Sequence, residues 1–446
     1  MSKVNRRKFI SAAVGGAIVA AAGYGYYEYS KKPTVITPTT QTTSTTTPGP
    51  KTTTPSPTMT PRPSTTQKPK LREGCPLVAN YDHWHYEIKP EEIQSFSKWN
   101  ILTLNFETAY YANSAIRQIR NLNPGIEILA WISLGFYKTP SGSGGVVEQS
   151  LLAGSTEDWW IHKKGAKTPS SRLHPVPWYP ELATPNPKSD FASKIVKFLH
   201  ESVLSTGLYD GVFFDVTWDN GWLTSVLSDA DISIIDWREG VTNIMKATRE
   251  NEGDDVIIIG NPGAEWRNDS SYWQYANGHY QENALGDAFG SKWDKMWEIY
   301  QRNMNKPSPP PRIHWIGVDT QYKRNRENYQ YAIPTDDDLR RMRLGLGTTL
   351  LLDNGYFGFD KGDGWHGHGK SWWYPEYDAE LGRPTQKYAK EGQLYKRVFE
   401  NGLIIVNPSG SNSKIQTKGT YRDVSTGIEG TEFTVNPYDA RILLEK

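Results

Sequence analysis

One stretch of the sequence combines a carboxylate with aromatic side chains in a pattern suited to sugar cleavage. Residues 209–220 read YDGVFFDVTWDN, so a short apolar run that begins at the turn residue Gly211 ends on Asp215. Such a run is typical of a buried parallel strand that carries the aspartate at its C-terminal end. Glycoside hydrolysis requires carboxyl groups, and sugar rings stack on aromatic side chains. Asp215 is therefore the first candidate catalytic residue, although an aspartate in this place can also cap a following helix.

A second carboxyl group is needed, because hydrolysis uses one protonated and one ionised acid on opposite sides of the scissile bond. Glu282 ends another predicted strand and is the candidate partner of Asp215, with Asp319 or Asp353 as alternatives. Further polar side chains are expected at the same ends of the predicted strands. We expect substrate binding from Tyr81, Asp82, Glu107, Asn261, Asp319 and Asp353.

Aromatic residues make up 12% of the chain, with 17 tryptophans. Tryptophans in loops that follow strands are candidate platforms for sugar rings, whereas a tryptophan inside a strand is equally well explained as core. The loop candidates are Trp84, Trp218, Trp222 and Trp365. The histidines at 83, 85, 366 and 368 lack the spacing of a known metal site, so we expect neither a metal ion nor a cofactor.

The elements that would position these side chains follow a repeating pattern. Short apolar runs alternate with helical patterns from about residue 75 onward, which is typical of βα units. One expected helix begins after Thr335, whose hydroxyl can cap a first turn of three aspartates. The expected strands are Leu77 to Tyr81, Ile101 to Phe106, Ile126 to Ile132, Gly211 to Asp215, Val256 to Ile259, Gly278 to Glu282, Ile313 to Val318 and Thr348 to Leu352. Eight such strands predict an α/β fold, a (β/α)8 TIM barrel with its active site at the C-terminal strand ends.

The flanking segments differ in composition from this region. Arg6 and Arg7 precede an apolar run of small residues, so residues 1–31 are expected to be a twin-arginine signal or a membrane anchor. Residues 32–70 are rich in Thr, Pro and Ser and predict an extended stalk. The barrel is expected to span 71–396, and alternating short strands predict a small antiparallel β domain over 397–446. We expect an exported protein, extracellular or at the cell surface, with any membrane tether confined to the N-terminal segment.

Charge and cysteine content exclude several classes. Lys and Arg number 50 against 49 Asp and Glu, which leaves a net charge of +1 and no field that would attract nucleic acid. We therefore expect a carbohydrate partner and no nucleic acid. The single cysteine, Cys75, excludes an intrachain disulfide and a cysteine-based metal cluster.

Three runs carry a resemblance to a known family: YDGVFFDVTWDN, WWYPEYDAELGRP from Trp372 to Pro384, and FENGLIIVNPSG from Phe399 to Gly410. They resemble the glycoside-hydrolase-like TIM-barrel family, which is similar in outline to the endo-α-1,4-polygalactosaminidase family. The resemblance covers the chain from about Pro76 to its C-terminus. It implies a (β/α)8 barrel, an acid at the end of the fourth strand that matches Asp215, and a C-terminal β domain. The long segment 136–187 and the stalk depart from the family pattern.

Two functions remain open at this stage. The first is an exported glycoside hydrolase of the retaining class, with Asp215 as nucleophile and Glu282 as acid/base. The second is a non-catalytic carbohydrate-binding or cell-envelope protein on the same barrel. Two carboxyl groups that face each other in one cleft would favour the enzyme.

Overall fold

The computed structural model describes residues 74–82, 86–138, 145–174, 182–217, 227–263, 271–285, 292–319, 335–360 and 373–446. The predicted signal segment and stalk lie outside these ranges. Within them, no helix is both long enough and apolar enough to span a membrane.

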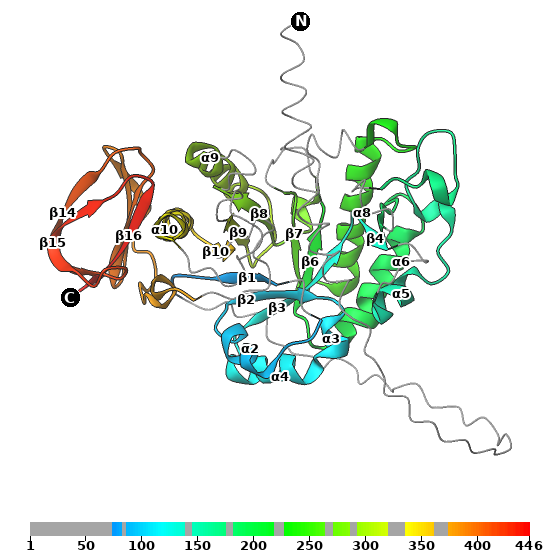
Figure 1. The fold of residues 1–446 in the computed structure, drawn as a ribbon, viewed down its shortest axis with the longest axis horizontal. Helices are drawn as coiled ribbons and strands as arrows, with labels where there is room; N and C mark the ends of the chain where they lie inside the picture. Colours follow the sequence, from blue (N-terminus) through cyan, green and yellow to red (C-terminus); the bar gives the residue numbers. More distant parts are fainter. Residues whose placement is uncertain are drawn as a thin grey trace, which may run out of the picture.

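Eight parallel strands form the central sheet, in the order β1-β2-β3-β6-β7-β8-β9-β10. The first and last strands approach each other, because Val78 bridges Phe357 and the Phe357 N–H donates to the Leu77 carbonyl at 3.0 Å. The sheet is thus nearly closed and fits the predicted TIM barrel (Figure 1). Its strands are β1 Ala79–Asp82, β2 Ile101–Asn105, β3 Glu127–Ser133, β6 Gly211–Asp215, β7 Ile257–Gly260, β8 Gly278–Ala284, β9 Ile313–Asp319 and β10 Gly355–Asp360.

Aromatic rings fill the inside of the barrel. The Tyr81 ring lies 4.8 Å from Phe213 and 5.1 Å from Tyr280, measured between centroids, and Trp315 packs against all three. Alternate residues of the strands point inward, so β1, β6, β8 and β9 each contribute one ring to this layer. The barrel is therefore a packed core, and the chemistry must lie at its C-terminal end.

Helices cover the outside of the barrel, and α6 shows how their apolar faces pack against it. Phe191 and Ile195 of α6 are buried, and the helix continues through a π-helical turn to Val203 before Gly207 takes a left-handed φ of 65°. The helices are α2 Pro90–Phe96, α3 Thr108–Tyr111, α4 Asn113–Leu122, α5 Val146–Leu152, α6 Phe191–Phe198, α8 Ile234–Glu252, α9 Trp293–Met304 and α10 Asp336–Leu350. Between β3 and β6 the chain also forms a two-stranded sheet, β4 Tyr137–Lys138 and β5 Leu182–Ala183.

The prediction of the eighth strand was wrong. Residues 348–350 complete helix α10, and the strand is β10, which begins at Gly355. Apolar and β-branched residues in this run suggested a strand, but both threonine hydroxyls are satisfied inside the helix. Thr348 Oγ1 donates to the Leu344 carbonyl at 2.6 Å, and Thr349 Oγ1 donates to the Gly345 carbonyl at 2.9 Å. The helix begins as predicted, where Thr335 forms a capping box with Asp338.

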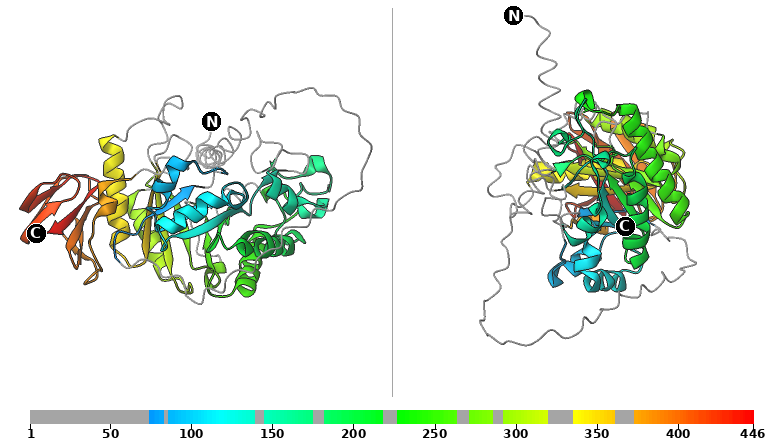
Figure 2. Two further views of the ribbon diagram at one scale, coloured as in Figure 1. Left: turned by 90° about the horizontal axis from the view of Figure 1, so that it is seen from below. Right: turned by 90° about the vertical axis from the view of Figure 1, so that its right-hand side faces the viewer.

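The C-terminal part of the chain is an antiparallel sheet, as predicted, in the order β11-β12-β13-β16-β14-β15. Helix α10 lies between this sheet and the barrel in two of the views (Figures 1 and 2). The sheet strands are β11 Ala389–Glu391, β12 Leu394–Phe399, β13 Gly402–Asn407, β14 Ser413–Asp423, β15 Glu429–Val435 and β16 Asp439–Glu445.

Two glycines let α10 pack closely on both sides. A Cβ atom at Gly345 would lie 2.6 Å from Val318 of the barrel, and one at Gly347 would lie 2.7 Å from Ala440 of the C-terminal sheet. Arg343 adds a two-pronged ion pair to the buried Asp439, with nitrogen–oxygen distances of 2.8 and 3.0 Å. The barrel and the C-terminal sheet therefore share one continuous core through this helix.

Candidate functional site

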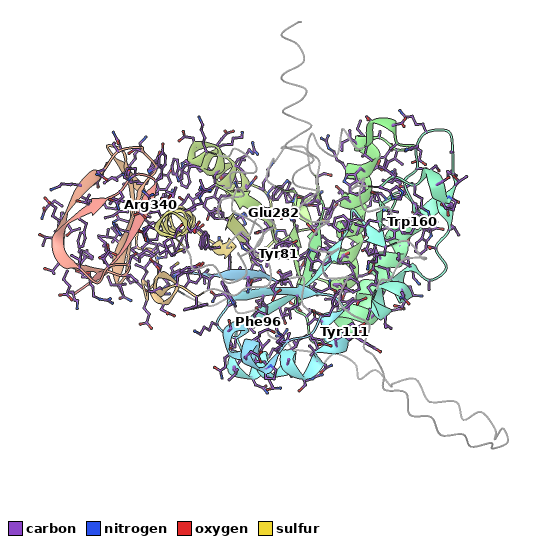
Figure 3. The ribbon with its side chains drawn as sticks, viewed as in Figure 1. Tyr81, Phe96, Tyr111, Trp160, Glu282 and Arg340 are labelled. Atoms are coloured by element: carbon purple, nitrogen blue, oxygen red, sulfur yellow. The ribbon has the colours of Figure 1, made fainter. Side chains whose placement is uncertain are left out.

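The two predicted catalytic carboxylates lie together at the C-terminal ends of their strands. Asp215 is the last residue of β6, and Glu282 lies near the end of β8. The strand between them, β7, is followed by Asn261, whose Nδ2 donates to Asp215 Oδ1 at 2.8 Å and to Glu282 Oε2 at 3.2 Å. One amide group thus bridges both carboxylates, and all three side chains are buried. Figure 3 shows Glu282 in the central part of the barrel, in the same region of the view as Tyr81.

The orientation of the Asn261 amide is set by the backbone around it. Its Oδ1 accepts the Gly263 N–H at 2.9 Å, which directs Nδ2 toward the carboxylates. The backbone of Asn261 continues the pairing with the neighbouring strand, since its N–H donates to the Phe214 carbonyl at 2.8 Å and its carbonyl accepts from Thr217 at 3.0 Å. The bridging group is therefore held in place before any ligand binds.

The environment of Asp215 shifts its proton equilibrium. Burial and the negative charge of Glu282 raise the pKa of Asp215 to about 7, although hydrogen bonds from the Val216 N–H, Asn261 and Trp131 act in the opposite direction. The Val216 N–H donates to Asp215 Oδ1 at 2.8 Å. Two nearby carboxylates resist ionising together, so Asp215 keeps its proton to a higher pH than an isolated aspartate does.

The backbone after each of these strands adopts an uncommon conformation. Val216, directly after Asp215, has a φ of 59°, and Leu285, directly after β8, has a φ of 62°. Left-handed φ is costly for residues with a Cβ, and above all for a β-branched one. Gly135 accommodates the first of them, because a Cβ at this position would overlap the Val216 side chain. Strained backbone of this kind is concentrated at functional sites.

The other predicted binding residues have varied positions. Tyr81 belongs to the aromatic core, where its hydroxyl accepts the Trp131 indole N–H at 2.9 Å. Asp82 is buried at the end of β1. Glu107 follows β2 and is also buried, but its Oε1 accepts the backbone N–H of Glu148 at 2.6 Å, so it holds the first turn of α5. Burial is the main cause that raises the pKa of Glu107 to about 7.

Asp353 is not at this end of the barrel, which corrects the prediction. It precedes β10 instead of ending a strand, so it lies at the opposite face, where it forms an ion pair with Arg397 of β12. The error follows directly from the misplaced eighth strand. Asp319 ends β9 and pairs in register with Asp360 of β10. The side chain of Asp319 lies outside the described residues, as do Trp84, Trp218, Trp222 and Trp365.

A pocket beside the carboxylates was missed by the sequence reasoning. Its wall includes Trp131, which also hydrogen-bonds Asp215, and Ser133, which pairs in register with Asp215. Further lining residues are Tyr86, Asn105, Phe136 and Glu148. Asn105 ends β2, so its place at a strand end was a usable signal, but Tyr86 and Glu148 come from connections whose path the sequence pattern did not indicate. In the described ranges, no group of three or more His, Cys, Asp or Glu is placed to hold a metal ion.

A family model described as hypothetical glycosyl hydrolase family 15 matches residues 90–403, more than half of the chain. The chain belongs to this family. Membership in the family confirms the prediction of a glycoside-hydrolase-like protein, while the likeness to polygalactosaminidases stays a prediction. A search of the curated proteins finds no match.

Several solved structures have a similar chain path at low identity. An isomaltulose synthase variant from Erwinia rhapontici has a TM-score of 0.49 and 8% identity over 83% of this chain and 98% of its own. The GH31 alpha-xylosidase of Xanthomonas citri has a TM-score of 0.46 and 11% identity over 84% and 47%. The GH36 alpha-galactosidase AgaA of Geobacillus stearothermophilus has a TM-score of 0.44 and 11% identity over 84% of this chain and 56% of its own, so the chain spans little more than half its length.

Proposed function

We propose that this protein hydrolyses glycosidic bonds in a poly- or oligosaccharide, with Asp215 and Glu282 as its catalytic pair. The observation that carries the proposal is the Asn261 amide, which hydrogen-bonds both carboxylates at once. Two acids held together at the C-terminal strand ends of a barrel are what this reaction requires. Membership in the glycosyl hydrolase family agrees with it.

The geometry supports a retaining mechanism. Since one nitrogen lies 2.8 Å from Asp215 Oδ1 and 3.2 Å from Glu282 Oε2, those oxygens can be no farther apart than the sum of the two distances. That limit of about 6 Å, which applies to one oxygen of each acid, is nearer to the ~5 to 5.5 Å of retaining carboxyl pairs than to the ~6.5 to 9.5 Å that inverting enzymes need for a water molecule. Asp215 would attack the anomeric carbon and form a glycosyl-enzyme ester, while Glu282 protonates the leaving oxygen and later deprotonates the incoming water.

The protonation of Asp215 makes the expected activity depend on pH. The three donors around Asp215 favour its ionised form, which the nucleophile needs, but burial and Glu282 place its pKa at about 7. We therefore expect activity to rise with pH through about 7, as Asp215 becomes ionised.

The alternative, a carbohydrate-binding protein without catalysis, is less well supported. It does not require two acids bridged by a fixed amide, and it does not explain the strained backbone at Val216 and Leu285 directly after β6 and β8. In a binding protein, replacing either acid would change carbohydrate affinity at most, because there is no hydrolysis to abolish.

The test is hydrolysis by full-length Asp215→Asn and Glu282→Gln variants across a panel of polysaccharides and aryl glycosides. Both variants should lose at least about a thousandfold in kcat/KM on a polysaccharide that the parent cleaves, where the leaving oxygen must be protonated. Azide should restore turnover of an activated aryl glycoside to Asp215→Asn with a glycosyl azide of inverted configuration if this residue is the nucleophile, whereas an azide of retained configuration would assign Asp215 as the acid/base. Asp353→Asn is the matched control, because its side chain lies at the opposite face of the barrel. Near-normal activity in either active-site variant would refute the assigned pair.

The place of action is part of the same proposal. The paired arginines Arg6 and Arg7 before an apolar run support export by the twin-arginine route, and the Thr-rich segment 32–70 would hold the barrel away from a surface. An exported hydrolase of this design would meet polysaccharide outside the cytoplasm.

A further inference from the structure

A line of tyrosine rings leads from the pocket to the outer surface. Tyr86 lines the pocket, and its ring centroid lies 5.9 Å from that of Tyr111. The Tyr111 centroid in turn lies 5.0 Å from that of Tyr110. These three residues, the tyrosine track, form edge contacts with interplanar angles near 80°. Figure 3 labels Tyr111, which ends α3, below the strands of the barrel in that view.

The inner end of the tyrosine track is connected to the catalytic pair. Trp131 is shared, because it lines the same pocket as Tyr86 and hydrogen-bonds Asp215. Ser133 is a second link, since it lines the pocket and pairs in register with Asp215. A ligand that reached Asp215 through this pocket would therefore meet Tyr86 next and the two outer rings after it.

The outer end of the track is exposed to solvent, and no helix or strand in the described part of the chain covers it. Tyr110 is 63% exposed and Tyr111 is 42% exposed, which is unusual for adjacent large aromatic residues. Their positions are nevertheless constrained. Both lie on α3, which begins directly after Glu107, and the Val146 backbone hydrogen-bonds the Tyr111 hydroxyl.

Glu107 connects the track to the rest of the site. Its buried carboxylate accepts backbone N–H groups at the start of α5, and α5 carries both Val146, which contacts Tyr111, and Glu148, which lines the pocket. A buried acid thus fixes the relative position of the outer rings and the pocket wall. Rings that are exposed yet held rigidly are suited to stacking on flat ligands at a small entropic cost.

We propose that the tyrosine track binds sugar units remote from the cleaved bond, so that the substrate is a long polysaccharide chain and not a short oligosaccharide. The inference rests on the proposed hydrolase function for the location of the cleaved bond. Pyranose rings present apolar faces that stack on tyrosine, and the three rings follow one another outward from the pocket whose wall residues Trp131 and Ser133 adjoin Asp215. Each occupied ring adds affinity for a chain and none for a substrate that ends inside the pocket.

The test compares binding and turnover on long and short substrates. The parent is first run through native gels cast with xylan, β-glucan, galactan, pectin or chitosan to find a polymer that slows its migration. Full-length protein carrying both Tyr110→Ala and Tyr111→Ala should bind that polymer about tenfold more weakly than the parent does. Its kcat/KM should fall about tenfold on that polymer and stay unchanged on an aryl glycoside of the same sugar. Tyr438→Ala, at a 56% exposed position in the turn between β15 and β16, is the matched control and should change neither value.

Failure of this inference can be separated from failure of the proposed function. The binding assay is repeated on an Asp215→Asn background, where no hydrolysis is needed for the readout. If the two tyrosines are needed for retardation but the parent cleaves no polymer, the tyrosine track is supported as a binding site and the proposed hydrolase function is refuted. Cleavage of a polymer with equal kcat/KM in the parent and the double variant, or no retardation of the parent by any polymer, would refute the track. The single Tyr110→Ala variant removes the more exposed ring and guards against misfolding of the double variant.

Discussion

Replacing Glu282 with Gln should stabilise the folded protein at pH 8 and leave its stability at pH 5 nearly unchanged. At pH 8 Asp215, whose pKa is raised to about 7, is ionised and faces the negative charge of Glu282. Gln removes that charge while its side-chain oxygen can still accept the hydrogen bond from Asn261. At pH 5 Asp215 is protonated in the native state, so there is little repulsion to relieve.

The magnitude follows from the distance and from the size of the pKa shift. Two unit charges about 6 Å apart, the largest separation that the shared Asn261 amide allows for the two bonded oxygens, repel by roughly 3 kcal/mol at an effective dielectric constant of about 20. The rise in the pKa of Asp215 from 3.8 to about 7 corresponds to about 4 kcal/mol from all causes together. Burial is the largest cause of this shift, and Glu282 is the second. We therefore expect the Glu282→Gln variant to gain about 1 to 2 kcal/mol at pH 8.

The sign of the pH dependence is fixed by linkage. A raised native pKa means that the native state binds more protons than the unfolded state between about pH 4 and pH 7, so stability is lost as pH rises through this window. Urea unfolding of the parent and of Glu282→Gln at pH 5 and pH 8 measures the difference, and Glu380→Gln at an exposed position is the control. Equal stabilisation at both pH values, or a loss of stability at pH 8, would refute the reasoning.

Three other perturbations test the fold, its acid sensitivity and its export. Gly347→Val should cost about 1 to 3 kcal/mol in urea unfolding, because even its Cβ would lie 2.7 Å from Ala440, and unchanged stability would contradict the close packing of α10. Burial lowers the pKa of His314 to about 4, so the parent should lose up to about 3 kcal/mol as the pH falls from 6.5 to 4. His314→Leu should lose less over that range, and an identical acid profile would exclude this histidine as a cause. Lys at both Arg6 and Arg7 should retain the protein in the cytoplasm, as cell fractionation would show, and normal export would refute the twin-arginine assignment.

Local pattern was sufficient for most of the elements. The run from Gly211 to Asp215 forms β6 with the predicted bounds. A short apolar run that follows a turn and ends on an acid is typical of a buried parallel strand, and here the local pattern agrees with the fold. The start of α10 was equally predictable, since the capping box of Thr335 and Asp338 is formed by neighbouring residues. Its end was not. The helix extends to Leu350 because Gly345 and Gly347 fit it between two sheets, and that requirement is not visible in local sequence.

The sequence by itself determined which residue types could carry the chemistry: a carboxylate after each of several strands, with Asp215 and Glu282 as the preferred pair. Only the tertiary structure decided how they act together. The parallel strand order places β6, β7 and β8 side by side, so Asn261 can bridge two acids that are distant along the chain. The same topology places Asp353 at the opposite face and gathers Tyr86 into a pocket beside Asp215. Side-chain identity is local, whereas burial, distance and the resulting pKa depend on which strands the fold makes neighbours.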